Sequence, residues 1–168
     1  MVNIKRWFRH AFMPPWRWSV LFPKKALTDI EEAIKNSEHQ HSGELRFAIE
    51  NALALSKVWG GMSARQRAVE MFSDLRVWDT AENSGVLIYV SVADREVHIV
   101  ADRGIAERVE QAEWDAIAQA MQKEYQQGDF LRGSLQGIER ITMLLAAHFS
   151  PATNNPNELS NKPVIVKH

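Results

Sequence analysis

Oxygen-bearing side chains border three apolar segments of this chain, at the positions where predicted strands would begin or end. Carboxylate and amide oxygens are the ligands that calcium and magnesium prefer in proteins. If the three segments are strands of one sheet, these side chains fall at one end of it. The pattern therefore predicts a site for Ca²⁺ or Mg²⁺, and its candidate ligands are Glu44, Asp79, Glu82, Asn83 and Asp102.

A cation held there would polarise a phosphoryl oxygen and orient a water molecule, which is the chemistry of metal-assisted phosphate hydrolysis. Arg103, next to Asp102, would stabilise charge on the transferring group. The catalytic candidates of this hypothesis are Asp79, Asp94, Asp102 and Arg103. The alternative is structural, because Asp and Asn at these positions also cap loops and Asp102–Arg103 also suits a surface pair.

Asp94 lies apart from the other acids, in the predicted turn between the second and third strands. With Arg95 it suggests a second cation or phosphate site, and we therefore add it to the candidate metal ligands. Asp also favours turns because its side chain bonds its own backbone. The topology places this turn at the end of the sheet opposite to Asp102.

Other chemistry has weaker support in the sequence. His39 and His41, near Glu38, are candidates for zinc or nickel, although histidines at a helix end also serve as partners of the helix dipole. The chain has no cysteine, which excludes a disulfide framework and a thiol nucleophile. It also lacks a phosphate-binding P-loop, a dinucleotide fingerprint and a nucleophile elbow.

Basic charge is concentrated in the first residues of the chain. Residues 1–28 contain six Lys and Arg and no acid, which leaves 14 basic and 21 acidic residues for the rest. An acidic body argues against nucleic-acid binding. The arm Met1–Lys25 interleaves aromatic residues with these cations, which suits a membrane surface or a membrane-protein partner. The alternative is a strap whose aromatic side chains pack on the domain, and Pro14-Pro15 favours it.

Hydrophobic periodicity predicts four helices and three strands. Helices are expected from Thr28, where Thr28–Glu31 matches a capping box, to before Ser42-Gly43, after Ser63, over Trp114–Tyr125 and over Leu131–Phe149. Strands are expected over 44–49, 85–92 and 97–101, the last two joined as an antiparallel hairpin. The first two strands should be parallel with a right-handed crossover.

This order predicts an α/β protein, a three-layer α/β/α sandwich with a small mixed β-sheet flanked by helices. We expect three regions: the aromatic-basic arm 1–25, the domain 26–150 and a flexible tail 151–168. No apolar run is long enough to span a bilayer, and no signal peptide is recognisable. A cytoplasmic location, peripheral to the inner membrane, is the expectation; the sequence leaves the oligomeric state open.

Three segments in this order resemble the TPM-domain family, the phosphatase-like domain of photosystem-repair and thylakoid-lumen proteins. They are Ser42–Glu50, Asp79–Val90 and Ala93–Ile105, and the likeness extends over Thr28–Phe149. The resemblance implies an α/β/α sandwich and, as in some members, bound calcium or a modest acid phosphatase activity. Many relatives carry a signal peptide and a membrane anchor, so this chain is similar to a standalone soluble bacterial subtype.

Two functions follow as hypotheses. In the first, the protein is a divalent-cation-binding interaction module that uses its arm to associate with a membrane surface or a membrane protein. In the second, it is a metal-assisted acid phosphatase acting on phosphate monoesters. The first is preferred, because no catalytic signature is present and a free-standing hydrolase would not need such an arm.

Overall fold

The computed structural model describes residues 3–151 and 155–168, and its centre is a four-stranded sheet in the order β3-β2-β1-β4. Its strands are β1 (Glu44–Glu50), β2 (Gly85–Ser91), β3 (Glu96–Ala101) and β4 (Val164–Val166). β1 pairs in parallel with β2 and with β4, whereas β2 and β3 form the predicted antiparallel hairpin. The sheet is therefore mixed, as the sequence predicted.

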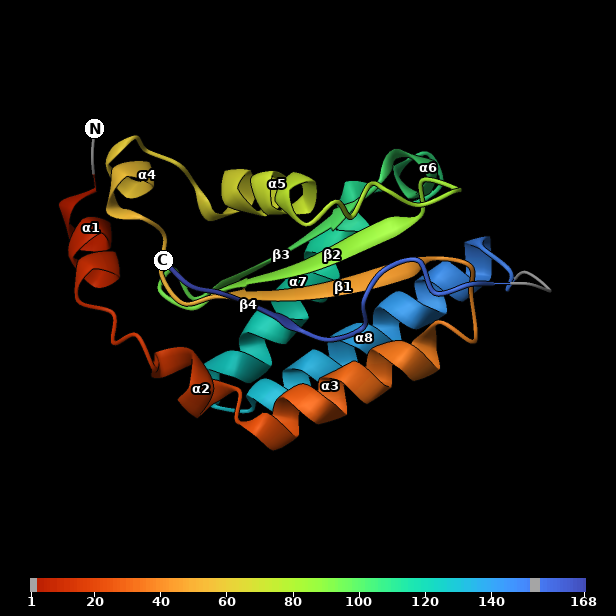
Figure 1. Ribbon diagram of the computed structural model, residues 1–168, viewed down its shortest axis with the longest axis horizontal. Coiled ribbons are helices and arrows are strands. Elements are labelled where there is room, and N and C mark those ends of the chain that lie inside the picture. Colours follow the sequence, from red (N-terminus) through yellow and green to blue (C-terminus); the bar gives the residue numbers. More distant parts are fainter. Residues whose placement is uncertain (1–2, 152–154) are drawn as a thin grey trace.

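Helices cover both faces of this sheet (Figure 1). One face carries α3 (Lys24–Ser37), α7 (Gln111–Gln126) and α8 (Phe130–His148), and the other carries α5 (Ala64–Asp74). Leu45, Phe47 and Ile49 of β1 enter the larger core beneath α3, α7 and α8, while Ala48 enters the smaller core beneath α5. This alternation is the period of two that a strand imposes, and it confirms the predicted three-layer α/β/α sandwich.

The first long helix begins one turn earlier than predicted. Pro23 is the N-cap of α3, and the hydroxyl of Thr28 donates to the carbonyl of Lys24 at 3.1 Å instead of capping a helix start. Proline suits this end of a helix because its fixed φ is compatible with the first turn. The predicted capping box at Thr28 is therefore wrong. As a result, α3 crosses the expected boundary between arm and domain at residue 25. At α5 the cap is as expected, since Ser63 and Gln66 form a reciprocal capping box.

The arm folds into two short helices, α1 (Ile4–Ala11) and α2 (Arg17–Leu21), at the end of the sheet where the β2–β3 turn lies (Figure 1). α1 contacts α4 (Leu55–Trp59), which follows β1. At the opposite end of the sheet, α6 (Arg103–Ala106) follows β3 directly. None of the described helices is long and apolar enough to cross a bilayer.

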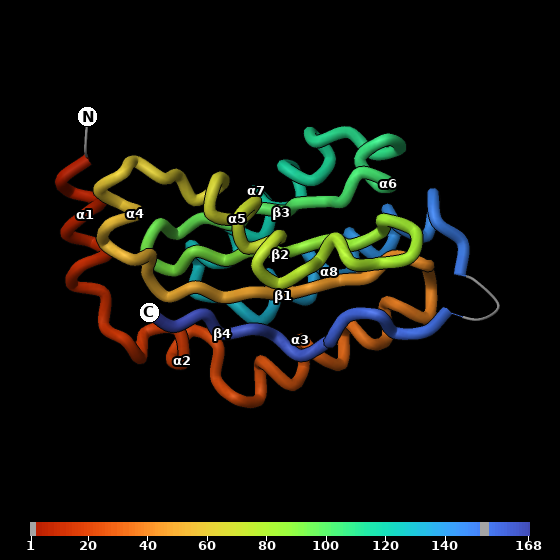
Figure 2. Tube along the Cα trace, turned by 45° about the horizontal axis from the view of Figure 1, so that its top comes forward, coloured from red at the N-terminus to blue at the C-terminus, as the bar shows by residue number. Residues whose placement is uncertain are grey.

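The prediction of a flexible tail is wrong for part of the segment 151–168. Val164, Ile165 and Val166 form β4 and pair with Ala48–Glu50 of β1. Figure 2 shows the tail running alongside β1 and ending near the arm. An open strand edge carries unpaired N–H and C=O groups. The pairing with β4 satisfies these groups along part of β1. Residues 152–154 of the predicted tail lie outside the described residues.

Candidate functional site

The predicted site residues divide between the two ends of the sheet, as the topology implied. Glu82, Asn83 and Arg103 meet at the end where β2 begins and β3 finishes, and there they line an open cavity of about 700 Å³. Asp94 lies at the opposite end, in the β2–β3 turn. The remaining lining residues of the cavity are Ser42, Gly104, Glu107, Arg108, His148, Phe149 and Ser150.

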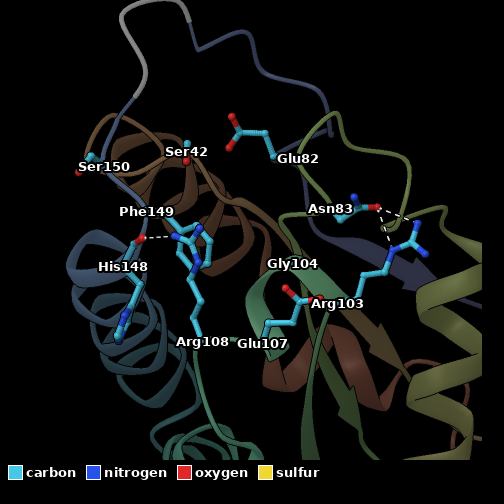
Figure 3. Close-up of a pocket in the computed structure, with 10 residues that line it drawn as sticks. All are labelled: Ser42, Glu82, Asn83, Arg103, Gly104, Glu107, Arg108, His148, Phe149 and Ser150. Atoms are coloured by element: carbon cyan, nitrogen blue, oxygen red, sulfur yellow. Dashed lines mark hydrogen bonds between the residues drawn. The ribbon is translucent and has the colours of Figure 1, made fainter.

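Two arginines border this cavity from opposite sides (Figure 3). Arg103 donates from Nε and Nη2 to Oδ1 of Asn83 at 3.3 and 3.2 Å. Arg108 lies 4.8 Å over the ring of Phe149 and donates to the carbonyl of His148 at 2.9 Å. Neutral partners thus position both guanidinium groups, and neither forms an ion pair among the described residues. The cavity therefore presents two unpaired cations, with the carboxylates of Glu82 and Glu107 also on its wall.

Asp102 caps α6 beside this cavity. Its Oδ1 accepts from the backbone N–H of Arg103 at 2.8 Å, while its Oδ2 is buried without a hydrogen-bond partner among the described residues. An unpaired buried carboxylate oxygen is unfavourable unless something else compensates it. Of the predicted ligands, Asp102 is therefore the one with a buried side-chain oxygen that has no hydrogen-bond partner among the described residues.

Glu44 and Asp79 do not join this group. Asp79 is exposed and forms an ion pair with Arg76 at 2.9 Å. Glu44 is 1% exposed and accepts a bond from the backbone N–H of Leu159 in the C-terminal tail at 3.0 Å. It lies on a separate cavity of about 440 Å³ that Glu38 and tail residues also line.

Within residues 3–151 and 155–168, no three His, Asp or Glu side chains lie close enough together to hold a metal ion. The six predicted ligands therefore do not form a ready cation site as they are arranged, and calcium or magnesium binding stays a prediction. The histidine pair is also separated: His41 is buried, whereas His39 is exposed. The ring of His41 lies 2.8 Å from Ser37 Oγ and accepts from Gly43 N at 3.2 Å, and burial lowers its pKa to about 4.

Asp94 is the anchor of the arm rather than an open ligand. Arg6 donates two hydrogen bonds to it, at 2.7 and 2.8 Å, and His10 lies 3.0 Å from its Oδ1. Burial alone would raise the pKa of Asp94, but the bonds to Arg6 and His10 outweigh this effect and hold the pKa well below its usual range. The buried ring of His10 also accepts from the backbone N–H of Leu53 at 3.0 Å. Arg6 and His10, which hold Asp94, both lie on the inner side of α1.

The outer side of α1 is apolar. Ile4, Phe8 and Phe12 recur every fourth residue and are 58%, 49% and 76% exposed. The rings of Phe8 and Phe12 stack with centroids 5.8 Å apart. Trp16 and Val20, in or beside α2, and Leu55 and Trp59 of α4, the helix that α1 contacts, are exposed as well. We call these seven residues the aromatic face. The alternative of a strap therefore holds only in part. The arm packs on the domain, but much of its apolar surface points outward instead of packing there.

A buried ion-pair network on the α5 side was missed by the sequence analysis. Glu50, at the end of β1, is 0% exposed and accepts bonds from Arg67 of α5, the hydroxyl of Tyr89 and the ring of His168. Arg67 also reaches Glu70 and Asp74. The signal was present in the sequence: Arg67 stands at i+3 from Ala64 and i−4 from Met71, on the buried stripe of its helix.

Comparison with known proteins agrees with this architecture. A family model described as the TPM domain matches residues 20–144. A solved structure, the BA42 protein of the psychrophilic bacterium Bizionia argentinensis, is 32% identical, with a TM-score of 0.74 over 84% of this chain and 93% of that one.

Two further solved structures share the fold at 12% identity. The N-terminal domain of a protein from P. gingivalis has a TM-score of 0.63, over 80% of this chain and 83% of its own. The N-terminal domain of cg2496 from Corynebacterium glutamicum has a TM-score of 0.53, over 86% and 80%. No curated protein matched. On the family match over residues 20–144 and the likeness to BA42, the chain belongs to the TPM domain family.

Proposed function

We propose that this TPM domain is an interaction module that docks on an anionic membrane surface through its aromatic face. The observation that carries the proposal is the orientation of α1. An α-helix advances about 100° per residue, so Phe8 lies opposite the stripe formed by Arg6 and His10. Because those two polar side chains are fixed inward on Asp94, the apolar stripe is held outward.

Charge on the same segment favours a bilayer with anionic lipids. Lys5 and Arg9 are exposed and lie between residues of the aromatic face in sequence. Aromatic rings lie favourably at headgroup depth, and each Lys or Arg near an anionic surface contributes about 1 kcal/mol. The exposed rings therefore supply insertion and the cations supply attraction to the surface. Such docking goes with the cytoplasmic location, peripheral to the inner membrane, that was expected from the sequence.

The docking test is co-sedimentation of the full chain with vesicles of phosphatidylglycerol and phosphatidylcholine. We expect binding that weakens with salt, because surface attraction between exposed charges is screened. Phe12→Ser should reduce the partition coefficient at least about tenfold, since burying an aromatic side chain contributes about 1.5–3 kcal/mol. Trp78→Ser is the matched control, because Trp78 is 47% exposed but lies outside the aromatic face. Absence of binding to these vesicles would overturn the proposal.

Acid phosphatase activity is the second candidate, and the arginine-bordered cavity favours it. Arg103 and Arg108 would hold the phosphoryl oxygens of a monoester while a water molecule attacks phosphorus and the alcohol leaves. Glu107 lines the same cavity and would accept the water's proton and pass it to the leaving oxygen. This candidate is tested by hydrolysis of p-nitrophenyl phosphate, with and without calcium or magnesium. Loss of turnover in Arg103→Gln, with turnover retained in Arg140→Gln, would support it.

Cation binding, the remaining part of the sequence hypothesis, has one supporting observation, the unpaired Oδ2 of Asp102. We propose this oxygen as the first ligand of any bound calcium or magnesium. Calorimetric titration with Ca²⁺ tests it. Heat of binding that disappears in Asp102→Asn but persists in Asp79→Asn is the expected result, and an unchanged titration in Asp102→Asn would contradict it.

A further inference from the structure

A cavity with a largely apolar wall lies at the opposite end of the sheet from Arg103, between the arm and the junction of α7 with α8. Its volume is about 400 Å³, within the range of about 300–1,000 Å³ that small-ligand pockets occupy. Apolar side chains form much of its wall. They are Met13 and Leu21 of the arm, Val90 and Val92 at the end of β2, and Tyr125 and Phe130 at the helix junction.

The position of this cavity is one that favours ligands. β1 and β2 are parallel, and residues 90–92 are the carboxyl end of β2 and its continuation. In open α/β sheets, ligands bind in the crevice outside the carboxyl ends of parallel strands. Here the arm forms the far wall of that crevice, because Arg6 and His10 fix it on Asp94 beside the same strand end.

The floor of the cavity is rigid and apolar. The rings of Tyr125 and Phe130 stack with centroids 4.8 Å apart, and Phe22 packs edge-on against both, at 6.0 and 5.5 Å. The hydroxyl of Tyr125 lies 2.7 Å from Ser134 Oγ, so its polar group is already paired within the protein. Tyr125 therefore offers its ring rather than a hydrogen bond to a ligand.

Two free cations line the same cavity. Arg17 comes from the arm and Arg95 from the β2–β3 turn. Across residues 3–151 and 155–168, neither guanidinium forms an ion pair or a side-chain hydrogen bond; the acid that lines the cavity, Glu96, is engaged by His98 at 2.8 Å. A site with an apolar wall and unpaired guanidinium groups is complementary to a ligand with an apolar chain and an anionic head.

We propose that this cavity binds a free medium-chain carboxylate, with the hydrocarbon chain against Tyr125 and Phe130 and the carboxylate between Arg17 and Arg95. The inference does not depend on the docking proposal, since neither the aromatic face nor a bilayer takes part in it. The two share only the arm, which presents Phe12 and Trp16 outward and Met13 and Arg17 to the cavity.

The experiment is calorimetric titration of the full chain, without vesicles, with octanoate, decanoate and dodecanoate below their critical micelle concentrations. We expect the affinity to rise about fourfold for each added methylene, the factor that corresponds to burying one CH₂ group, until the cavity is filled. Decanol, which has the chain but no charge, should bind at least tenfold more weakly than decanoate, because hydrogen bonds to charged groups are the stronger ones.

Two variants locate the site. Arg95→Gln should weaken decanoate about tenfold and leave decanol unchanged. Gln126→Trp should abolish binding of both by filling the cavity, and it should fold normally because Gln126 is an exposed lining residue. Arg140→Gln, an exposed arginine on α8 outside the cavity, is the control and should bind as the wild type does.

Three outcomes would overturn the inference: no heat with any carboxylate, an affinity independent of chain length, or decanoate binding that survives Gln126→Trp. Vesicle binding is measured separately, so loss of one activity does not affect the reading of the other. Arg95→Gln should still sediment with anionic vesicles, because Arg95 is not part of the aromatic face.

Discussion

Arg6 and Asp94 are 88 residues apart in sequence and form a two-pronged ion pair, with N–O distances of 2.7 and 2.8 Å, that fastens the arm to the end of the sheet. The side chain of Asp94 is 3% exposed and that of Arg6 is 18% exposed. His10 adds a third bond to the same carboxylate. The contact fixes both the outward aromatic face and the wall of the apolar cavity.

Replacing Asp94 with Ala should therefore release α1. Removing one partner of a buried ion pair typically costs about 3–5 kcal/mol. Because Arg6 can reach water here, we expect a loss of about 3 kcal/mol in urea unfolding. Amide exchange of residues 4–11 should speed up at the same time. Asp79→Ala is the control, because its ion pair is exposed; equal destabilisation by the two variants would contradict the anchoring role.

The buried pair Glu50–Arg67 should contribute more to stability than any exposed ion pair of the chain. Arg67→Met should destabilise the fold by about 3–5 kcal/mol, because it leaves the fully buried carboxylate of Glu50 without its main partner. The double variant Arg67→Met with Glu50→Gln should recover part of the loss, since the uncompensated charge is then gone. Chemical unfolding measures both, and a double variant less stable than the single one would rule out this account.

Glu38 should make stability depend on pH near neutrality. Burial and the nearby carboxylate of Glu44 raise its pKa to about 7, from 4.5, while bonds from Leu45 N–H and Asn161 oppose the shift. A raised carboxyl pKa means that the folded state holds a proton that the unfolded state has lost, so this group favours folding increasingly as pH falls from about 7 to 4.5. The residues that face it are Glu44, Leu45 and Asn161.

Glu38→Gln isolates this effect because its side chain stays neutral at every pH. We expect the variant to raise the melting temperature by a few degrees at pH 8, where about 2–4 °C corresponds to 1 kcal/mol for a domain of this size. At pH 5 the gain should disappear. Glu32→Gln, on the exposed side of α3, should show no such dependence. A gain of equal size at both pH values would show that the charge is not responsible.

Local patterns predicted the body of the fold well because its helices and strands follow the hydrophobic periodicity of their own segments. β4 was missed because three residues, Val164–Val166, carry little local signal and gain their structure from pairing with β1 more than a hundred residues earlier. The attachment of the arm was left open for the same reason. It depends on Arg6 and His10 reaching Asp94, and no local pattern encodes that contact.

The candidate site, like the fold, could be predicted only in part from the sequence. Topology correctly brought Glu82, Asn83 and Arg103 to one sheet end, because the ends of strands follow from strand order. It could not give side-chain directions, so Glu44 was grouped with them although β1 turns it toward the tail. Arg108 and Phe149 were missed as members of this site because they come from a loop and from the end of α8.

Gly104 should be essential for the shape of this sheet end. A Cβ atom at residue 104 would lie 2.6 Å from the carbonyl oxygen of Glu82 and 2.7 Å from that of Asn83, so α6 approaches the 79–84 loop too closely for any other residue. Neither oxygen belongs to a flexible side chain, and the loop itself must move. Gly104→Ala should destabilise the protein by about 1–3 kcal/mol, the usual range for overpacking. It should also separate Arg103 from Asn83, which two-dimensional NMR of the Arg103 guanidinium would register.

Gly60→Ala is the matched control, because its nearest contacts are carbonyl atoms at 3.4 and 3.6 Å, ordinary van der Waals distances. If both glycine variants unfold at the same urea concentration, the close approach at residue 104 does not constrain the loop.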